Sequence, residues 1–247
     1  MIELEFGGAV AWLRLGRTRA LNALNRDLTA AIETALDDVA GREEVAVLVV
    51  TGRGRAFCAG NDVAEMATLT AAEAEALAVR QAALMDRFAR LPPVTLAAVD
   101  GYALGGGLML ALAHDLRIAS DRARLGLPEV TLGFNPAYGI ARLLDVVGGG
   151  VGRDLLLTGR TVHASEALRL GLVNRVVAAP TLEASAAAWA AEIARSPRAA
   201  LSTTKAIVRA LRAGQPGHEA GAYATLLTSA EARARIAGFV SRSRRAP

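Results

Sequence analysis

The segment at residues 94–110 constrains the fold of this chain more than any other. It begins as a continuous apolar run, turns at Asp100-Gly101, passes through three consecutive glycines and ends in a second apolar stretch. A short apolar run is typical of a strand buried on both faces of a parallel sheet. Glycines let the backbone approach a ligand, and a helix that starts there has unpaired N–H groups that attract a negative oxygen. The segment alone is equally compatible with a backbone oxyanion site and with a close-packed strand–helix junction.

A second segment, residues 45–66, has a similar organisation. An apolar, β-branched run at residues 45–51 is followed by a loop with several small residues, among them Ala59 and Gly60. Two such loops from neighbouring strands could each supply one N–H group to a single oxyanion. The second segment therefore favours the interpretation of both loops as one site.

Strands and helices are expected to alternate through the first half of the chain. Apolar runs predict strands at residues 10–15, 94–99 and 116–120, in addition to the strand at residues 45–51. Asn25 is a good N-cap for a helix that reaches Ala40, with apolar residues at helical spacing. This alternation predicts an α/β fold with a largely parallel sheet and helices on its faces.

The composition fits one large domain with a helical extension. The chain has 247 residues, of which 53% are hydrophobic and only 4% aromatic. From about Pro180 onward, Ala, Arg, Glu and Leu recur with helical spacing. We therefore predict a core domain at residues 1–180 and a helical C-terminal region at residues 181–247. The alanine-rich faces of this region are poor at forming a core alone, so we expect them to pack on the main domain or on a neighbouring subunit.

Several classes of protein are disfavoured by the sequence. No apolar run approaches the roughly 18–20 residues that span a bilayer, and the N-terminus lacks the pattern of a signal peptide. The single cysteine, Cys58, excludes an intrachain disulfide framework, and the three histidines lack metal-ligand spacing. We expect a cytoplasmic protein with no membrane partner and no metal.

The net charge of +4 is modest, and much of the excess lies between Arg233 and Arg245. A basic tail can bind nucleic acid, but no aromatic stacking surface or nucleic-acid motif accompanies this one. We therefore expect no nucleic-acid partner. A helix that docks on a neighbouring subunit, or lies near an anionic ligand, fits this tail better.

Five blocks of sequence carry a resemblance to a known family. They are Ala56–Val63, Ala98–Gly107, Leu127–Gly133, Leu157–Arg160 with Ala164–Ala167, and Gly171–Val176. In order and spacing these blocks resemble the crotonase, or enoyl-CoA hydratase/isomerase, superfamily, and the match covers nearly the whole chain. The resemblance implies a crotonase-like ββα superhelix with a helical C-terminal region through which subunits assemble as trimers or as dimers of trimers. It also implies an acyl-CoA thioester as substrate and no separate cofactor, because coenzyme A is part of that substrate.

The resemblance also implies which backbone groups hold the thioester oxygen. By position they are the N–H groups of Asn61 and Gly106. Each such donor is typically worth roughly 3–4 kcal/mol of the reaction barrier, because the negative charge develops on the oxygen that it contacts. For Asn61, a second interpretation is a turn residue held by its own side chain, and both can be true.

Glu129 is the candidate for proton transfer. It follows Pro128 in an otherwise apolar segment, where a carboxyl group should have a raised pKa that suits proton exchange near neutral pH. The pattern alone is equally compatible with a solvent-facing glutamate on a loop. The family has its second catalytic glutamate in this Pro-Glu position, so the resemblance implies the catalytic role.

The sequence departs from the hydratase pattern at one position. Hydratases of the family have another glutamate two residues past the last glycine of the run, and this chain has Met109 there. Methionine cannot activate water, whereas one base suffices to move a double bond. Tyr138 and Asn135 are unusual polar residues in the loop after Glu129 and could assist. A Tyr138 that caps the following helix is the alternative.

The coenzyme A moiety is expected along two loops. By resemblance, the binding groups are Arg19, Ala20, Leu21, Ala59, Gly60 and Asp62, with Gly105 and Met109 on the acyl side. Asp62 is usually structural at this position in the family. Arg17 or Arg19 could meet a phosphate.

We interpret the chain as an acyl-CoA enzyme that works through a thioester enolate. Double-bond isomerisation of an enoyl-CoA with the single glutamate is favoured. Hydration or dehydration of an enoyl-CoA, and cleavage or formation of a carbon–carbon bond on the same enolate, are the alternatives within enzymes. A non-catalytic scaffold that binds coenzyme A is the alternative from another class.

Overall fold

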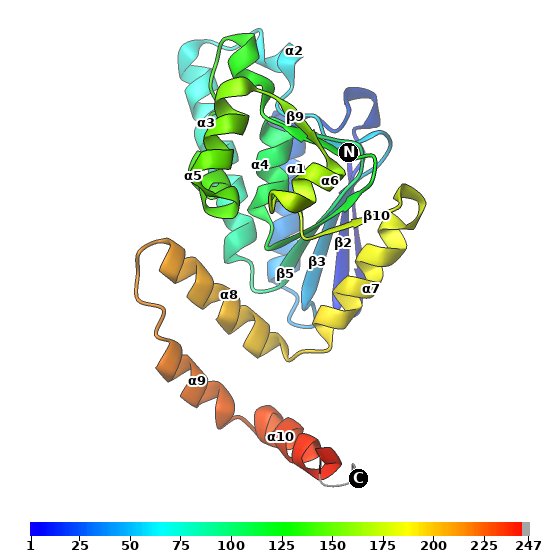
Figure 1. The fold of residues 1–247 in the computed structure, drawn as a ribbon, viewed down its shortest axis with the longest axis vertical. Helices are drawn as coiled ribbons and strands as arrows, with labels where there is room; N and C mark the ends of the chain where they lie inside the picture. Colours follow the sequence, from blue (N-terminus) through cyan, green and yellow to red (C-terminus); the bar gives the residue numbers. More distant parts are fainter. Residues whose placement is uncertain (244–247) are drawn as a thin grey trace.

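A computed structural model describes residues 1–243 and contains two sheets flanked by helices (Figure 1). The larger sheet has the strand order β1-β2-β3-β5-β7-β10, and only the β1–β2 pair is antiparallel. Its strands are β1 (Ile2–Gly7), β2 (Val10–Leu15), β3 (Val47–Gly52), β5 (Val94–Val99), β7 (Leu116–Ser120) and β10 (Arg175–Val177). The predicted α/β class and its largely parallel sheet are confirmed.

A second, smaller sheet has the order β4-β6-β8-β9. Its strands are β4 (Ala56–Cys58), β6 (Tyr102–Leu104), β8 (Arg124–Gly126) and β9 (Thr161–His163). The first three directly follow β3, β5 and β7, and each long-and-short strand pair leads into a helical segment. This repetition is the ββα unit that the family resemblance implies, although the pattern of residues did not locate the short strands, and it carries three loops to one side of the molecule.

Helices cover both faces of the larger sheet. The helices are α1 (Arg26–Ala40), α2 (Val63–Met66), α3 (Ala71–Arg90), α4 (Gly106–Ala113), α5 (Ile140–Thr158), α6 (Ala164–Arg169), α7 (Leu182–Ala194), α8 (Arg198–Arg212), α9 (Glu219–Leu227) and α10 (Ala230–Ser243). On β3, Leu48 and Val50 pack in one cluster with α1, α3 and α4, whereas Val47 and Val49 pack in another with α7. Because successive side chains of a strand point to opposite faces, this alternation buries β3 on both sides.

Local sequence signals explain where the two longer helices of the first half begin. Asn25 caps α1 by accepting a hydrogen bond of 2.9 Å from the Leu28 N–H, as predicted. Thr70 and Glu73 form a reciprocal capping box at the start of α3.

Helix α5 is kinked in its interior. Gly148 has φ 76° and ψ 163°, so the glycine-rich stretch forms a kink between two helical parts.

The C-terminal region divides into two parts. Helix α7 buries Leu182, Ala186, Trp189 and Ala190 against the larger sheet, so it completes the core. Helix α8 passes beneath the body, where it contacts α3 and β5, and α9 and α10 project from it as an arm (Figure 1). Neither α8 nor α9 contains a buried residue. Of the basic stretch predicted to meet a neighbouring subunit, Arg244 and Arg245 lie outside the described residues.

The Lys205 side chain, 8% exposed, holds α8 against the body of the molecule. The Lys205 ammonium group lies 2.7 Å from an Asp115 carboxylate oxygen and donates hydrogen bonds of 2.8 Å to the carbonyl groups of Phe88 and Pro93. These three contacts use the N–H donors of the Lys205 ammonium group, so this lysine is not available to bind a phosphate.

Among residues 1–243, no helix combines the length and the apolar character needed to cross a bilayer.

Candidate functional site

A pocket opens where five segments meet: the loop after β4, helix α2, the start of α4, the short helix η2 (Pro128–Leu132) and the loop before α5. Its lining comprises residues 59–61, 63, 66, 105, 106, 109, 128, 129, 132 and 134–138. The pocket therefore brings together nine predicted site residues, namely Ala59, Gly60, Asn61, Gly105, Gly106, Met109, Glu129, Asn135 and Tyr138. Arg19, Ala20, Leu21 and Asp62 are not part of its lining.

The first candidate oxyanion loop, residues 59–62, is held by a short parallel bridge between Leu24 and Asn61. The Leu24 N–H donates to the Gly60 carbonyl at 2.7 Å, and the Asp62 N–H donates to the Leu24 carbonyl at 2.9 Å. Backbone groups alternate in direction along an extended segment, so the N–H of Asn61 points away from Leu24. Asn61 lines the pocket, and its N–H donates no backbone hydrogen bond among the described residues.

The second candidate oxyanion loop is the start of α4, at Gly105 and Gly106. Gly105, at the N-cap, has φ 52° and ψ −125°, a conformation that is open essentially to glycine alone. Gly106 is the first residue of the helix, where an N–H has no partner within the helix. A Cβ placed on Gly60 would lie 3.6 Å from the Gly106 nitrogen, so the two loops approach each other closely. The two loops that carry the candidate donors are therefore neighbours at one side of the pocket.

Glu129 is buried in the pocket wall. The residue is 8% exposed, and its Oε2 atom has no hydrogen-bond partner among the described residues. Oε1 lies 2.7 Å from the position that a Cβ on Gly105 would take. Burial raises the pKa of the Glu129 carboxyl above its ordinary value. The solvent-facing alternative is therefore wrong, and the carboxyl stands beside the start of α4.

The methionine position is also buried. Met109 is 2% exposed, and its sulfur would lie 2.6 Å from a Cβ on Gly139, so the side chain packs against the turn that starts α5. Glu129 is the only acidic residue among those that line the pocket. The pocket consequently has one group able to exchange a proton in the ordinary pH range.

Tyr138 belongs to the pocket rather than to the helix that follows it. Its hydroxyl donates a hydrogen bond of 2.9 Å to Asn61 Oδ1, and the residue is 8% exposed. The N-cap of α5 is Gly139, with no side-chain capping bond, so the alternative of a helix-capping tyrosine is wrong. Burial, followed by the nearby Cys58 and Glu129, raises the pKa of the Tyr138 phenol, which stays protonated at neutral pH.

Three other polar or reactive residues are engaged elsewhere. Asn135 lies at the exposed rim of the pocket and donates a hydrogen bond of 2.9 Å to the carbonyl group of Pro136. Asp62 caps α2 and pairs with Arg17 at 2.6 Å, so its carboxylate is structural. Burial raises the pKa of the Cys58 thiol to about 12, which makes a nucleophilic role unfavourable.

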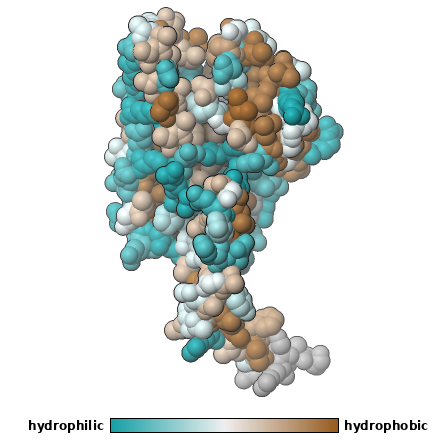
Figure 2. Space-filling view, turned by 90° about the vertical axis from the view of Figure 1, so that its left-hand side faces the viewer, coloured by the Kyte–Doolittle hydropathy of each residue, from teal (hydrophilic) through white to brown (hydrophobic). Residues whose placement is uncertain are grey.

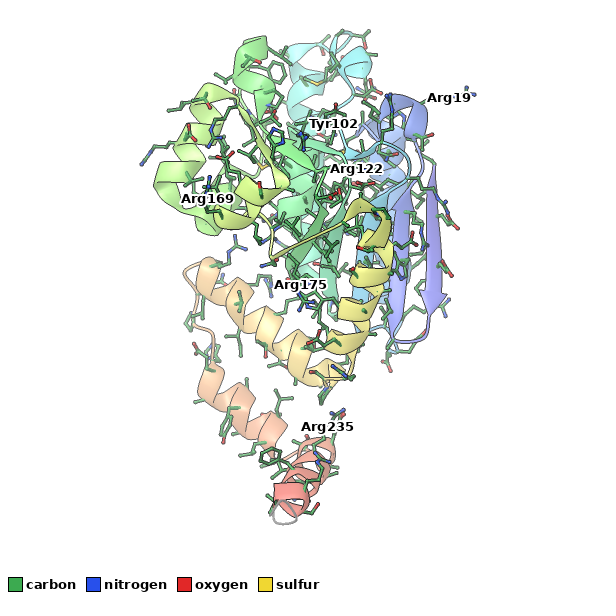
Figure 3. All side chains as sticks on the ribbon, turned by 45° about the vertical axis from the view of Figure 1, so that its right-hand side comes forward. Arg19, Tyr102, Arg122, Arg169, Arg175 and Arg235 are labelled. Atoms are coloured by element: carbon green, nitrogen blue, oxygen red, sulfur yellow. The ribbon has the colours of Figure 1, made fainter. Side chains whose placement is uncertain are left out.

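The segment predicted to bind coenzyme A runs beside the first oxyanion loop. The Ala59 N–H donates a hydrogen bond of 3.0 Å to the Leu21 carbonyl, so the two predicted loops are neighbours. Arg19 is exposed and its side chain points away from the body of the molecule (Figure 3). Arg17 is occupied by Asp62 and the Ala23 carbonyl, which leaves Arg19 as the accessible cation for a phosphate.

The sequence interpretation missed two features of the site. The first is the hydrogen bond between Tyr138 and Asn61, which joins positions 77 residues apart in the chain. The second is the apolar wall of the pocket, to which Val63, Met66, Leu132 and Phe134 contribute. Their only signal was their position directly after the two predicted site loops.

Within residues 1–243, no group of three or more His, Cys, Asp or Glu residues is arranged to hold a metal ion.

The buried carboxyl group predicts a pH-dependent effect on stability. Because the pKa of Glu129 is raised on folding, the folded chain binds more protons than the unfolded chain above the ordinary value of 4.5, and stability falls as the pH rises through that window. We expect Glu129→Gln to unfold at a higher temperature than the wild type at about pH 8, with a smaller gap at about pH 5. A gain of about 1 kcal/mol would raise the midpoint by roughly 2–4 °C. Thermal unfolding at both pH values checks this, and a variant less stable at both would contradict it.

Comparison with known proteins agrees with the sequence blocks and the geometry. Residues 5–237 match the family model described as enoyl-CoA hydratase/isomerase. A protein from Mycobacterium avium named probable enoyl-CoA hydratase echA17 is 40% identical over 191 residues, which cover 77% of this chain and 74% of the relative. The short-chain-enoyl-CoA hydratase of Clostridium acetobutylicum is 39% identical over 178 residues, which cover 71% of this chain and 68% of the relative.

Solved structures share the whole fold. The crystal structure of an enoyl-CoA hydratase from Bacillus anthracis superposes with a TM-score of 0.92 and 31% identity, covering 98% of this chain and 96% of that one. A Geobacillus kaustophilus structure described as enoyl-CoA hydratase subunit I gives a TM-score of 0.90 and 37% identity over 98% of this chain and 95% of that one. Both cover the arm as well as the two sheets.

Proposed function

Because this chain belongs to the enoyl-CoA hydratase/isomerase family, we propose that it moves a carbon–carbon double bond in an enoyl-CoA thioester, with Glu129 as the single proton-transfer group. One observation carries this proposal. Glu129 is the only acidic residue among those that line the pocket. By the family resemblance, Met109 stands where hydratases have a second glutamate. Membership of this family makes the chain an enzyme that acts on acyl-CoA thioesters. Within the family, one carboxyl group in the pocket instead of two favours isomerisation over hydration.

The first step of the proposed reaction takes a proton from carbon 2 of a 3-enoyl-CoA. The Glu129 carboxylate accepts this proton, and the electron pair left behind delocalises onto the thioester oxygen. The N–H groups of Asn61 and Gly106 stabilise that oxygen, and each donor contributes roughly 3–4 kcal/mol to lowering the barrier. Burial of Glu129 supports this role, because a raised pKa brings the carboxyl closer to the acidity of the carbon that it deprotonates.

The second step returns the proton two carbons away. The Glu129 carboxylic acid donates it to carbon 4, the double bond forms between carbons 2 and 3, and the carboxylate is regenerated. A single base can serve both positions because the acyl chain lies along the pocket beside it. The apolar wall described above and the adjacent Met109 side chain suit a hydrocarbon chain.

Hydration of a 2-enoyl-CoA is the second candidate function. The named relatives are described as enoyl-CoA hydratases, which favours this reaction by analogy. Cleavage or formation of a carbon–carbon bond would use the same enolate, but no observation favours it specifically. A non-catalytic scaffold is disfavoured because Glu129 and both N–H loops are present in one pocket.

Incubation with a panel of 2-enoyl- and 3-enoyl-CoA esters in deuterated water, followed by mass spectrometry, tests the proposal. Isomerisation converts a 3-enoyl ester into its 2-enoyl isomer, with deuterium entering at carbon 4 to the extent that Glu129 exchanges with solvent. Hydration adds the mass of deuterated water instead. A protein that leaves every 3-enoyl ester unchanged would refute isomerisation.

Replacement of Met109 by glutamate is expected to shift the balance between the two reactions. If Met109 occupies the position of a water-activating glutamate, Met109→Glu should raise the rate of hydration relative to isomerisation by about tenfold or more. The new carboxyl would be buried beside Gly139, so the variant should also lose stability. Met109→Gln has the same shape without the charge and serves as the control. A folded glutamate variant with an unchanged ratio would show that other pocket groups decide the reaction.

We expect the protein to assemble as a trimer or a hexamer through its arm. Apolar side chains of α9 and α10, including Tyr223, Leu227, Ile236 and Val240, are exposed in the single chain. Brown apolar atoms are visible on the arm where it projects from the body (Figure 2). Exposed apolar surfaces of this kind commonly mark interfaces, and a repeated contact gives closed symmetry. Light scattering after size-exclusion chromatography checks this, and an active monomer at micromolar concentration would rule it out.

A further inference from the structure

The sequence has one lysine, Lys205, among its 28 lysine and arginine residues. Arginine guanidinium groups stay protonated in proteins, whereas a lysine amine can lose its proton and then be acylated. Acyl-CoA thioesters, the substrate class of this family, are acyl donors for such amines. Lys205 is therefore the only side-chain amine of this chain that its own substrate class could modify.

The Lys205 ammonium group is enclosed where three segments of the body meet. It donates hydrogen bonds of 2.8 Å to the carbonyl groups of Phe88, in the last turn of α3, and of Pro93, directly before β5. It also lies 2.7 Å from an oxygen of Asp115, directly before β7, and the Lys205 side chain is 8% exposed. These three acceptors account for the three hydrogens of an ammonium group. Oxygen atoms thus surround the nitrogen that a thioester carbonyl carbon would have to approach.

The Asp115 carboxylate is held in place by the neighbouring strand. Its Oδ2 atom, which faces Lys205, accepts hydrogen bonds from the Thr95 N–H at 2.7 Å and from the Thr95 hydroxyl at 2.8 Å. The Asp115 N–H donates to the same hydroxyl oxygen at 3.0 Å. Thr95 is fully buried on β5. The acceptor therefore belongs to the sheet, and Lys205 reaches it only when α8 is docked against the body.

Two arginines at the ends of α8 tether the same helix. At its start, Arg198 Nε donates a hydrogen bond of 2.9 Å to the carbonyl group of Val45. At its end, the Arg212 guanidinium group lies 2.6 Å from a carboxylate oxygen of Asp145 on α5. None of these four residues is a partner of Lys205. The docking of α8 can therefore be weakened without altering any group that contacts the lysine.

We propose that docking of α8 shields Lys205 from acyl-CoA thioesters, so that this lysine is a modification site that reacts only while α8 is detached from the body. The inference rests on acyl-CoA as the substrate class. It is independent of whether the pocket isomerises or hydrates its substrate, because the modification does not use the pocket.

The modification is an acyl transfer from sulfur to nitrogen. Once α8 is detached, the ammonium group loses one proton to solvent, and the amine nitrogen attacks the thioester carbonyl carbon. A carbon–nitrogen bond forms and the carbon–sulfur bond breaks. The nitrogen loses a second proton to the coenzyme A thiolate, which leaves as a thiol. The acylated side chain has no charge and one N–H, so at least two of the three acceptors would lose their donor if α8 docked again.

The acetylation rate of Lys205 tests the inference. The full-length protein is incubated with acetyl-CoA at a fixed concentration, and mass spectrometry of its peptides follows the modification. Arg209→Lys is the matched control, because it introduces an exposed lysine about one turn further along the same helix. We expect the introduced lysine to react about 100-fold faster than Lys205, which reacts only in the fraction of molecules with α8 detached. Similar rates at the two lysines would overturn the inference.

Two variants weaken the docking of α8 by different routes. The double variant Arg198→Ala, Arg212→Ala removes both tethers and should raise the acetylation rate of Lys205 by about tenfold or more. Asp115→Asn should raise it as well. That change also removes the charge that opposes the lowering of the Lys205 pKa by burial, so the tether variant is the sharper test. Hydrogen exchange of the α8 amides, measured in parallel, reports detachment directly.

The two readouts together decide the outcome. Faster exchange in α8 without faster acetylation of Lys205 would overturn the inference, and so would an unchanged acetylation rate in the tether variant. Acetylation is measured without enoyl-CoA turnover. A protein that fails to isomerise 3-enoyl-CoA esters would therefore refute the proposed function and leave the shielding of Lys205 standing.

Discussion

Replacement of Glu129 by glutamine is expected to reduce turnover by about 10²–10⁴-fold while leaving acyl-CoA affinity nearly unchanged. Glutamine keeps the size and the hydrogen-bonding shape of the side chain, but it cannot accept or return a proton. Within residues 1–243, no other acidic residue lines the pocket, so we expect no neighbouring carboxyl group to take over. Binding should persist because the thioester oxygen and the coenzyme A moiety are proposed to contact the backbone of other loops.

Steady-state rates and equilibrium binding of a non-reactive acyl-CoA measure the two effects separately. Glu75→Gln makes the same substitution at an exposed position of α3 and is expected to leave both quantities unchanged. Wild-type turnover in Glu129→Gln would remove Glu129 from the mechanism. A parallel loss of binding would show that the carboxyl positions the substrate rather than transferring its proton.

The fold could be predicted largely from the sequence because its signals are local. The apolar runs at residues 10–15 and 94–99 became β2 and β5 with the predicted bounds, and Asn25 marked the start of α1. The short strands β4, β6 and β8 were not predicted, since three residues carry too little pattern to distinguish a strand from a loop. Their pairing depends on contacts between segments that are distant in the chain.

The sequence alone indicated that two glycine-bearing loops could meet in one site, whereas the choice of Asn61 and Gly106 as N–H donors came from the family resemblance. The apolar neighbours of Glu129 correctly indicated its burial. The contact between Tyr138 and Asn61 was not predictable, because the two residues are brought together by tertiary packing alone. The same packing places Met109 against Gly139.

The second large effect is expected from a single methyl group at Gly105. Its φ of 52° and ψ of −125° are strained for any residue with a Cβ, at a cost of about 1–3 kcal/mol of stability. The added Cβ would also lie 2.7 Å from Glu129 Oε1, so the carboxyl or the start of α4 must move. We therefore expect Gly105→Ala to lower turnover by about 10²–10³-fold, since displacement of either group by roughly 1 Å misaligns the proton-transfer and oxyanion groups.

A second glycine with a positive φ, Gly8, tests whether the effect of Gly105→Ala comes from contact with Glu129 or from backbone strain alone. Gly8 lies in the β1–β2 turn with φ 65°, and a Cβ there would meet nothing within 4 Å. Gly8→Ala should therefore lose stability while keeping wild-type turnover at a temperature where it remains folded. Turnover of both variants, measured well below their unfolding midpoints, checks this difference. A folded Gly105→Ala with wild-type turnover would mean that the carboxyl and the α4 amide tolerate displacement, and the close packing of Glu129 over Gly105 would then have no part in catalysis.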